Sequence, residues 1–146
     1  MGDRALLIAH AVLGFAALFA ATHHAAHALF AALGRPRPRA LRRFGAIAPA
    51  MLLAAVAFGL AIYPAYALRV RAPDFDLYAP AAARLFDFKE HLAALALALV
   101  LGASIAGRLD RRPEARWPIA ALSCSGAAFL WAVSIIGLYV TARHPL

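Results

Sequence analysis

The chain is poor in cysteine and in acidic residues. Its one cysteine, Cys124, excludes an intramolecular disulfide and any metal site built from several thiolates. Seven Asp and Glu residues stand against fifteen Lys and Arg residues, which gives a formal net charge of +8. The sequence also lacks a glycine-rich nucleotide-binding motif and a recognisable pair of nucleophile and general base. Composition and motifs therefore point away from nucleotide-dependent and hydrolytic enzymes.

Polar residues are scarce as well, because 64% of the residues are hydrophobic and the mean hydropathy is +0.74. A soluble domain is about half apolar, and a small one leaves much of its surface exposed to water. A helix needs about 20 mostly apolar residues to span a bilayer. The apolar residues of this chain gather in four such runs, at about 5–33, 44–66, 86–107 and 117–141. We therefore expect a single integral membrane domain over residues 1–146. Its fold class is all-α, a four-helix transmembrane bundle with up-down antiparallel topology, in contact with the lipid bilayer.

The basic residues lie between the apolar runs, where they act as topology signals. The first and third connections face the same side of the membrane and share nine of them: Arg35, Arg37, Arg39, Arg42, Arg43, Arg108, Arg111, Arg112 and Arg116. Short loops rich in Lys and Arg stay in the cytoplasm. We therefore expect an inner-membrane protein of a bacterium, with both termini outside, in the periplasm. This placement favours lipid headgroups and argues against nucleic acid as a partner, since the charge does not cover one face of a soluble domain.

The longest connection, at about 70–86, joins the second and third spans. Pro73 and Pro80 interrupt it, so we expect a loop that ends where Pro80 begins the next helix, a position that suits proline. The spans themselves are rich in alanine and glycine. Small residues let membrane helices approach closely, which predicts a compact bundle.

Histidine is the unexpected polar residue of the spans. His10 and His24 are fourteen residues apart and share one face of the first helix, while His91 begins the apolar part of the third span. Counted from the outer side, His10 and His91 lie at matched depth, on helices that can face each other across an antiparallel bundle. Two neutral imidazoles at one level can ligate one haem iron. The sequence therefore predicts a haem b with His10 and His91 as its axial ligands.

Three further residues complete this predicted haem site. Asp87 precedes His91 by one helical turn and can accept a hydrogen bond from the ring nitrogen that does not bind metal. Arg69 and Arg71 lie at the same outer edge and can hold the haem propionates through charge-assisted hydrogen bonds.

A second group of histidines, His23, His24 and His27, lies deeper in the first span, in the stretch "ATHHAAHALF". No other helix has a histidine at their level, but Met51 of the second span lies at about the same depth. His24 or His27 with Met51 is therefore a weaker candidate for a second haem site. The HHxxH pattern lacks the further ligands of a di-iron or hydrolytic zinc site, so packing or contact with a partner is favoured for these three histidines.

Three segments carry a resemblance to a known group of proteins. "IAHAVLGFAALF", "RRFGAIAPAMLLAAVAFGLAIY" and "FDFKEHLAALALALVLGASIAGRLDRR" resemble the small four-helix bacterial membrane proteins of the copper-resistance D and membrane protoporphyrinogen oxidase type. Those families share a histidine early in the first helix, an Arg-rich first loop and a lysine at the start of the third helix. The corresponding residues here are His10 and Lys89. The resemblance covers residues 6–112 and implies a four-helix bundle with a haem link, without assigning an enzyme activity.

These observations favour a small b-type haem-binding integral membrane protein that acts in electron transfer or haem handling, as a subunit of a respiratory complex. Two alternatives stay open. The first is a cofactor-free structural accessory subunit of a larger membrane complex, whose partners would be other membrane subunits or further copies of the chain. The second is a metal or proton conduit lined by His23, His24 and His27.

Overall fold

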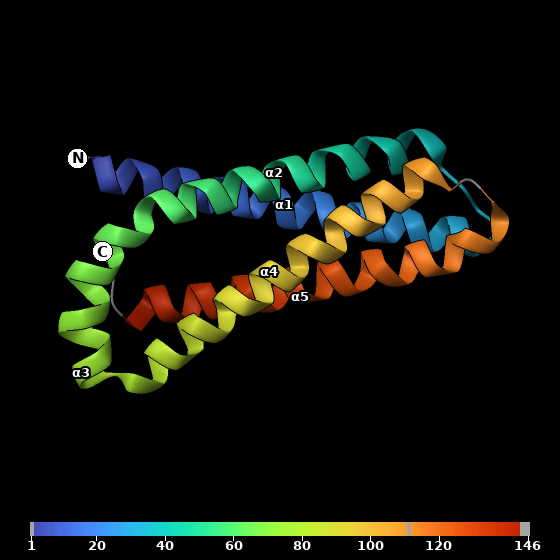
Figure 1. The fold of residues 1–146 in the computed structure, drawn as a ribbon. Coiled ribbons are helices and arrows are strands. Elements are labelled where there is room, and N and C mark those ends of the chain that lie inside the picture. Colours follow the sequence, from blue (N-terminus) through green and yellow to red (C-terminus); the bar gives the residue numbers. More distant parts are fainter. Residues whose placement is uncertain (1, 111, 144–146) are drawn as a thin grey trace.

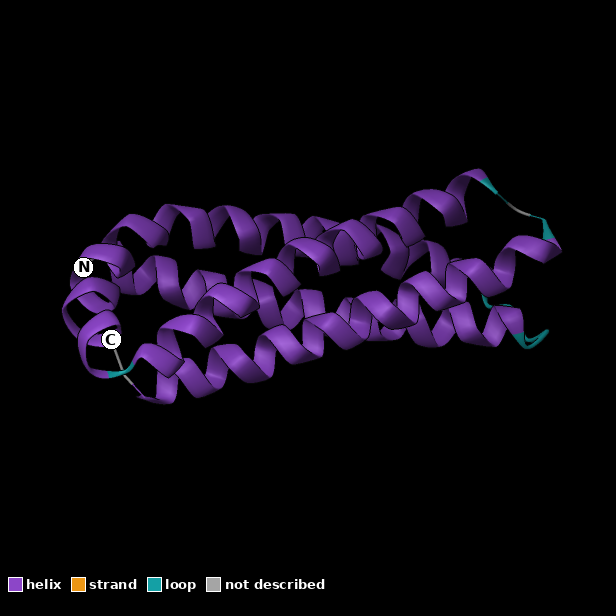
Figure 2. Cartoon of the chain, turned by 60° about the horizontal axis from the view of Figure 1, so that its bottom comes forward, coloured by secondary structure: helices purple, strands orange, loops and turns teal. Residues whose placement is uncertain are grey.

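Four long helices make up nearly all of the protein in the computed structural model, which describes residues 2–110 and 112–143. Helix α1 spans Gly2–Ala32, α2 spans Pro38–Tyr66, α4 spans Pro80–Leu109 and α5 spans Arg116–Arg143. They run alternately up and down along one axis (Figure 1). Within the described residues the structure contains helices and short connections and no strand (Figure 2). The predicted all-α four-helix bundle is confirmed.

Each helix packs against two neighbours, in the cyclic order α1, α2, α4, α5, so α1 and α4 are diagonal to each other. The core between them is built largely from alanine; Ala17, Ala48, Ala96 and Ala103 have no exposed surface. Alanine permits this close approach because its side chain adds little bulk between the helix backbones.

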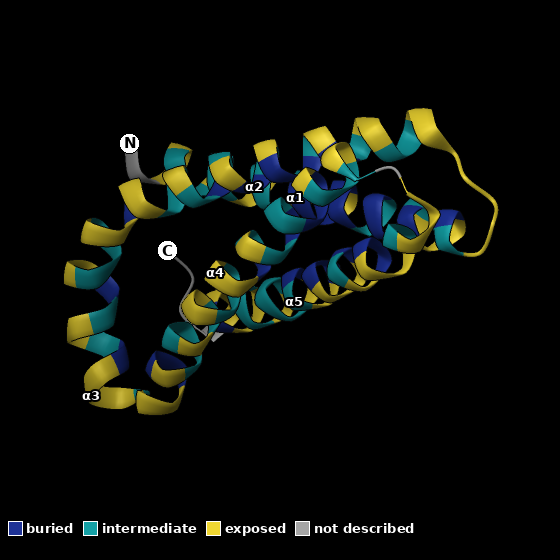
Figure 3. Ribbon diagram, turned by 45° about the vertical axis from the view of Figure 1, so that its right-hand side comes forward, coloured by how far each residue is buried: buried dark blue, intermediate teal, exposed yellow. Residues whose placement is uncertain are grey.

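The outer surface of the bundle is apolar instead of charged. Large hydrophobic side chains such as Ile8, Leu60 and Ile135 are each at least 60% exposed. Exposed residues cover the outer faces of the helices, and buried ones line the inner faces (Figure 3). All four long helices have the length and the apolar composition needed to cross a membrane. This is the architecture of an integral membrane protein whose surface contacts the lipid bilayer.

The connection between α2 and α4 is helical, whereas the sequence predicted a loop. A π-helical segment, η1 (Ala67–Phe75), and a short helix, α3 (Asp76–Tyr78), cross the end of the bundle at which α1 begins and α5 ends (Figure 1). This end is called the outer end below, and the opposite end is called the inner end. Val70 and Phe75 are buried there against the start of α4 and the end of α5, and this burial stabilises the segment. The wider π turn accommodates Pro73, which lacks a backbone N–H and would crowd the carbonyl of an ordinary α turn. Pro80 occupies the first turn of α4, as predicted.

Helices α1 and α2 pack in a seven-residue register. The ring of His10 lies against Gly59, and the ring of His24 lies against Gly45. Both pairs of positions are fourteen residues apart, and buried Leu52 lies midway between the two glycines on α2. A repeat of seven keeps the same faces together along two antiparallel helices. The two histidines therefore occupy equivalent positions in one interface, as their shared face predicted.

Candidate functional site

His10 is held in place by α2. Its ring Nδ1 lies 2.8 Å from the backbone carbonyl oxygen of Ala55. A carbonyl oxygen only accepts hydrogen bonds, so the ring donates from Nδ1–H and keeps a free lone pair on Nε2. Gly59 provides the space for the ring, because a Cβ there would lie 3.0 Å from Cε1 of His10. The half-buried imidazole is thus fixed in the tautomer that suits ligation through Nε2.

His91 has the same tautomer but a different setting. Its Nδ1 lies 2.8 Å from the carbonyl oxygen of Asp87, one turn earlier on α4, so Nδ1–H again donates and Nε2 keeps its lone pair. The ring is exposed. It is held only by its own helix, which leaves it freer to turn than the ring of His10.

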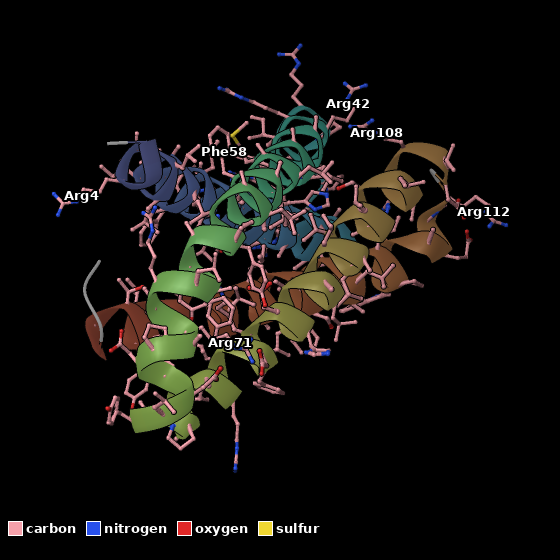
Figure 4. All side chains as sticks on the ribbon, turned by 60° about the vertical axis from the view of Figure 1, so that its left-hand side comes forward. Arg4, Arg42, Phe58, Arg71, Arg108 and Arg112 are labelled. Carbon is pink, nitrogen blue, oxygen red and sulfur yellow. The ribbon has the colours of Figure 1, made fainter. Side chains whose placement is uncertain are left out.

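The side chain of Asp87 binds Arg71 and does not bind His91, which corrects the predicted contact. Its two carboxylate oxygens accept hydrogen bonds of 2.7 and 3.0 Å from Nη1 and Nη2 of Arg71. Arg71 also lies 3.6 Å from a carboxylate oxygen of Asp76. The physical reason is the helical course of η1, which brings Arg71 beside the first turns of α4; Figure 4 shows Arg71 at this place. The predicted propionate-binding arginine is therefore already engaged, and its bidentate ion pair ties η1 to α4. Arg69 is exposed on η1.

The helix register places His10 and His91 near the same level. His24 contacts Ser123 of α5, and the side chain of Lys89 lies beside Gly137 of the same helix. Ser123 and Gly137 are fourteen residues apart, as are His24 and His10, so His10 lies at the level of Lys89. His91 is two residues further along α4, an axial offset of about 3 Å at 1.5 Å per residue.

Their directions differ, however. The ring of His10 faces α2, whereas the ring of His91 is on the exposed surface of the diagonal helix α4. The structure places the two rings at similar depth without bringing them into one shared contact.

Two polar residues at this outer end were not among the predicted site residues. Lys89 has a side chain only 14% exposed; its Nζ lies 3.1 Å from a carboxylate oxygen of Glu90 and 4.3 Å from the ring centre of Phe86. Tyr66 stacks on the same Phe86 ring at 4.4 Å, and its buried hydroxyl has no hydrogen-bond partner. Lys89 precedes buried Ala96 by seven residues on α4, and Ala96 precedes buried Ala103 by seven more. That periodicity is the sequence signal that marks Lys89 as an inward-facing residue.

The inner histidines pack inside the bundle. His24 is only 4% exposed, and its Nε2 lies against Gly45 of α2. Its Nδ1 lies 3.5 Å from Oγ of Ser123, whose hydroxyl donates to the carbonyl of Ile119 at 2.7 Å. Nδ1–H of His24 is therefore the donor to Oγ, and both ring nitrogens face neighbouring helices.

His23 and His27 share a different neighbour. Both rings pack against Phe44 of α2, with ring centres 5.0 and 5.8 Å from it. Nδ1–H of His23 donates to the carbonyl of Phe19 at 2.9 Å, and Nδ1 of His27 is buried without a partner. Across residues 2–110 and 112–143, no three His, Cys, Asp or Glu side chains are grouped so that they could hold a metal ion. The three histidines are thus distributed over two packing environments.

Met51 does not share the level of these histidines, which corrects its expected depth. It packs against the core cluster that contains Leu52, six residues from Gly45 on α2. Because Gly45 marks the level of His24, Met51 is displaced by about 9 Å along the helix.

The inner end of the bundle carries a shallow cavity of about 400 Å³ between the end of α4 and the start of α5. Asp110 and Arg112 line it, joined by hydrogen bonds of 2.7 and 3.0 Å. The Arg112 guanidinium lowers the pKa of Asp110 to about 2. The cavity contains no histidine.

No family model, curated protein or solved structure matches the chain. The likeness to the copper-resistance D and membrane protoporphyrinogen oxidase families therefore rests on the sequence segments alone.

Proposed function

We propose that the protein is a small b-type haem-binding membrane protein that acts in electron transfer or haem handling. The observation that carries this proposal is the state of His10. Its Nδ1–H is fixed by the Ala55 carbonyl, its ring fits the space at Gly59, and its Nε2 lone pair is uncommitted. Histidines that ligate metal are commonly oriented by such a hydrogen bond from the other ring nitrogen.

His91 is the proposed second ligand. It lies near the level of His10 and has the same Nδ1–H tautomer, and its exposed ring would have to leave its present direction to reach a ligand held by His10. Two histidine ligands give haem iron a one-electron redox centre with no open coordination position. Arg69 and Arg71 on η1 are the proposed partners of the propionates, and Arg71 would bind them beside its ion pair to Asp87.

The two histidines match a haem in tautomer and depth, although their rings point in different directions and would have to converge on the iron when haem binds. The inner histidines fit less well, since His24 has no ring nitrogen directed to open space. We therefore assign the haem to the outer end.

Three histidine variants test this function. The protein is purified from haem-replete cells, and its visible spectrum is recorded oxidised and reduced. His10→Ala should abolish haem binding, and His91→Ala should convert the spectrum to a five-coordinate, high-spin type. His23→Ala is the matched control, because His23 lies on the same helix with the same Nδ1–carbonyl hydrogen bond, and it should keep the native spectrum. Low-spin spectra that persist in both the His10 and His91 variants would contradict the assignment. A native protein without pigment would favour the cofactor-free accessory subunit.

We also propose an orientation, with the connections between α1 and α2 and between α4 and α5 in the cytoplasm. Nine of the fifteen basic residues lie at that end, against only two acidic residues, Asp110 and Glu114. In a bacterial inner membrane, the proposed orientation would put both termini in the periplasm.

A further inference from the structure

The basic side chains at the ends of the bundle differ in whether they have an acidic partner. At the outer end, Arg71 binds Asp87 and Asp76, and Lys89 binds Glu90. At the inner end, Arg112 binds Asp110. Arg42 and Arg108, also at the inner end, are exposed and have no ion pair or hydrogen bond from their side chains among the described residues.

Arg42 and Arg108 come from different helices but emerge at one corner. Leu41 of α2 and Ala106 of α4 belong to the same packed cluster around Ile119. Arg42 follows Leu41 directly, and Arg108 lies in the last turn of α4. Figure 1 shows the start of α2 and the end of α4 close together, and Figure 4 shows the two arginine side chains leaving the bundle at the same corner. Two guanidinium groups with no anionic partner among the described residues thereby leave the bundle at one corner.

The surface next to this corner is apolar. On α2, the exposed residues Ala46 and Ala50 follow Arg42 at four-residue steps, so they continue its face into the membrane. On α4, exposed Ile105 precedes Arg108 by three residues and continues its face into the membrane. The two charges therefore lie above a surface lined by exposed apolar residues of α2 and α4.

We propose that this corner binds the headgroup of an anionic phospholipid, with Arg42 and Arg108 on its phosphate and an acyl chain along the exposed apolar residues of α2 and α4 below them. Guanidinium groups bind phosphate oxygens through two parallel N–H donors, which favours a phosphate over a single carboxylate oxygen. Basic sites between membrane helices on the cytoplasmic side suit acidic lipids. The apolar surface below the charges selects a lipid over a free anion, because a soluble phosphate gains nothing from it.

The test is lipid binding to the full chain in detergent. Native mass spectrometry measures the amount of bound lipid as phosphatidylglycerol, or phosphatidylcholine with the same acyl chains, is titrated in. Inorganic phosphate is then added as a competitor. Phosphatidylglycerol should bind more tightly than phosphatidylcholine, and Arg42→Gln/Arg108→Gln should weaken it about 30-fold, since each arginine near an acidic lipid surface contributes roughly a factor of five.

The matched control removes the same charge from the opposite end. Arg4 and Arg84 are exposed, and Arg4→Gln/Arg84→Gln should leave the affinity for phosphatidylglycerol within about twofold of the native value. If the double glutamine variant at the corner fails to fold, Arg42→Lys/Arg108→Lys keeps the charge and should lose affinity measurably but by less than the roughly 30-fold expected for glutamine, because lysine lacks the bidentate fork.

Two results would overturn the proposal. The first is equal affinity for phosphatidylglycerol in the corner variant and the control. The second is displacement of the lipid by inorganic phosphate at comparable concentration, which would show a simple anion site without lipid selection.

Discussion

The ring of His10 fills the space that Gly59 leaves on the neighbouring helix. The contact is close, since a Cβ at Gly59 would lie 3.0 Å from Cε1 and 3.2 Å from Nδ1 of His10. The same Nδ1 is bound to the carbonyl of Ala55, so the ring cannot easily retreat. One helix therefore provides both the hydrogen bond and the space that fix the histidine of the other.

Gly59→Ala should destabilise the protein relative to Gly14→Ala. Alanine favours a helix over glycine by about 1 kcal/mol at either position. At Gly14 nothing lies within 4 Å of the new methyl group, so that gain is retained. At Gly59 the methyl group crowds His10, and overpacking costs about 1–3 kcal/mol. Thermal unfolding of both variants in detergent measures the difference, and equal midpoints would show that His10 yields freely.

The contact of Gly45 with His24 should appear as a coupling energy. Gly45→Ala places a methyl group 3.0 Å from Nε2 of a buried ring, and His24→Ala removes that ring. In a double-mutant cycle the Gly45→Ala cost should largely vanish in the His24→Ala background, with a coupling of about 0.5–3 kcal/mol. The coupling energy is calculated from the unfolding free energies of the native protein, the two single variants and the double variant. Simple additivity would mean that the two residues do not touch in the folded protein.

The Arg71–Asp87 ion pair should hold η1 against α4. Asp87→Asn should cost about 0.5–1 kcal/mol, a modest value because both side chains are partly exposed and screened by solvent. Faster tryptic cleavage after Arg69 and Arg71 would report the loosened segment. Asp76→Asn serves for comparison, because its oxygen lies 3.6 Å from Arg71, and cleavage should change less. Identical cleavage rates in the two variants and the native protein would remove this role from Asp87.

The spans and the shared face of His10 and His24 could be predicted from the sequence. The length of an apolar run and the 3.6-residue period act locally, and neither depends on which helices become neighbours. The partner of Asp87 could not be predicted, because it depends on the course of η1, where the burial of Val70 and Phe75 keeps the chain helical through Pro73. The contacts of Gly59 with His10 and of Gly45 with His24 could not be predicted either. They depend on how α1 and α2 are aligned along each other, and the sequence pattern of one helix carries no information about that alignment.

The orientation is tested by reporter fusions in the two arginine-rich connections. Fusions at Gly34 and at Asp110 should report from the cytoplasm, because both connections carry the excess of arginine. A fusion in the outer segment, at Asp76, should report from the opposite side. Activity of a periplasmic reporter at Gly34 or Asp110 would reverse the proposed topology.

The visible spectrum of the native protein tests the central claim most directly. Purified from haem-replete cells, the protein should show a Soret band and, on reduction, the sharp α and β bands of a low-spin haem b with two histidine ligands. His10→Ala should remove these bands while the helical content by circular dichroism stays unchanged. A folded native protein that is colourless, and that remains colourless after haem is added, would contradict the account.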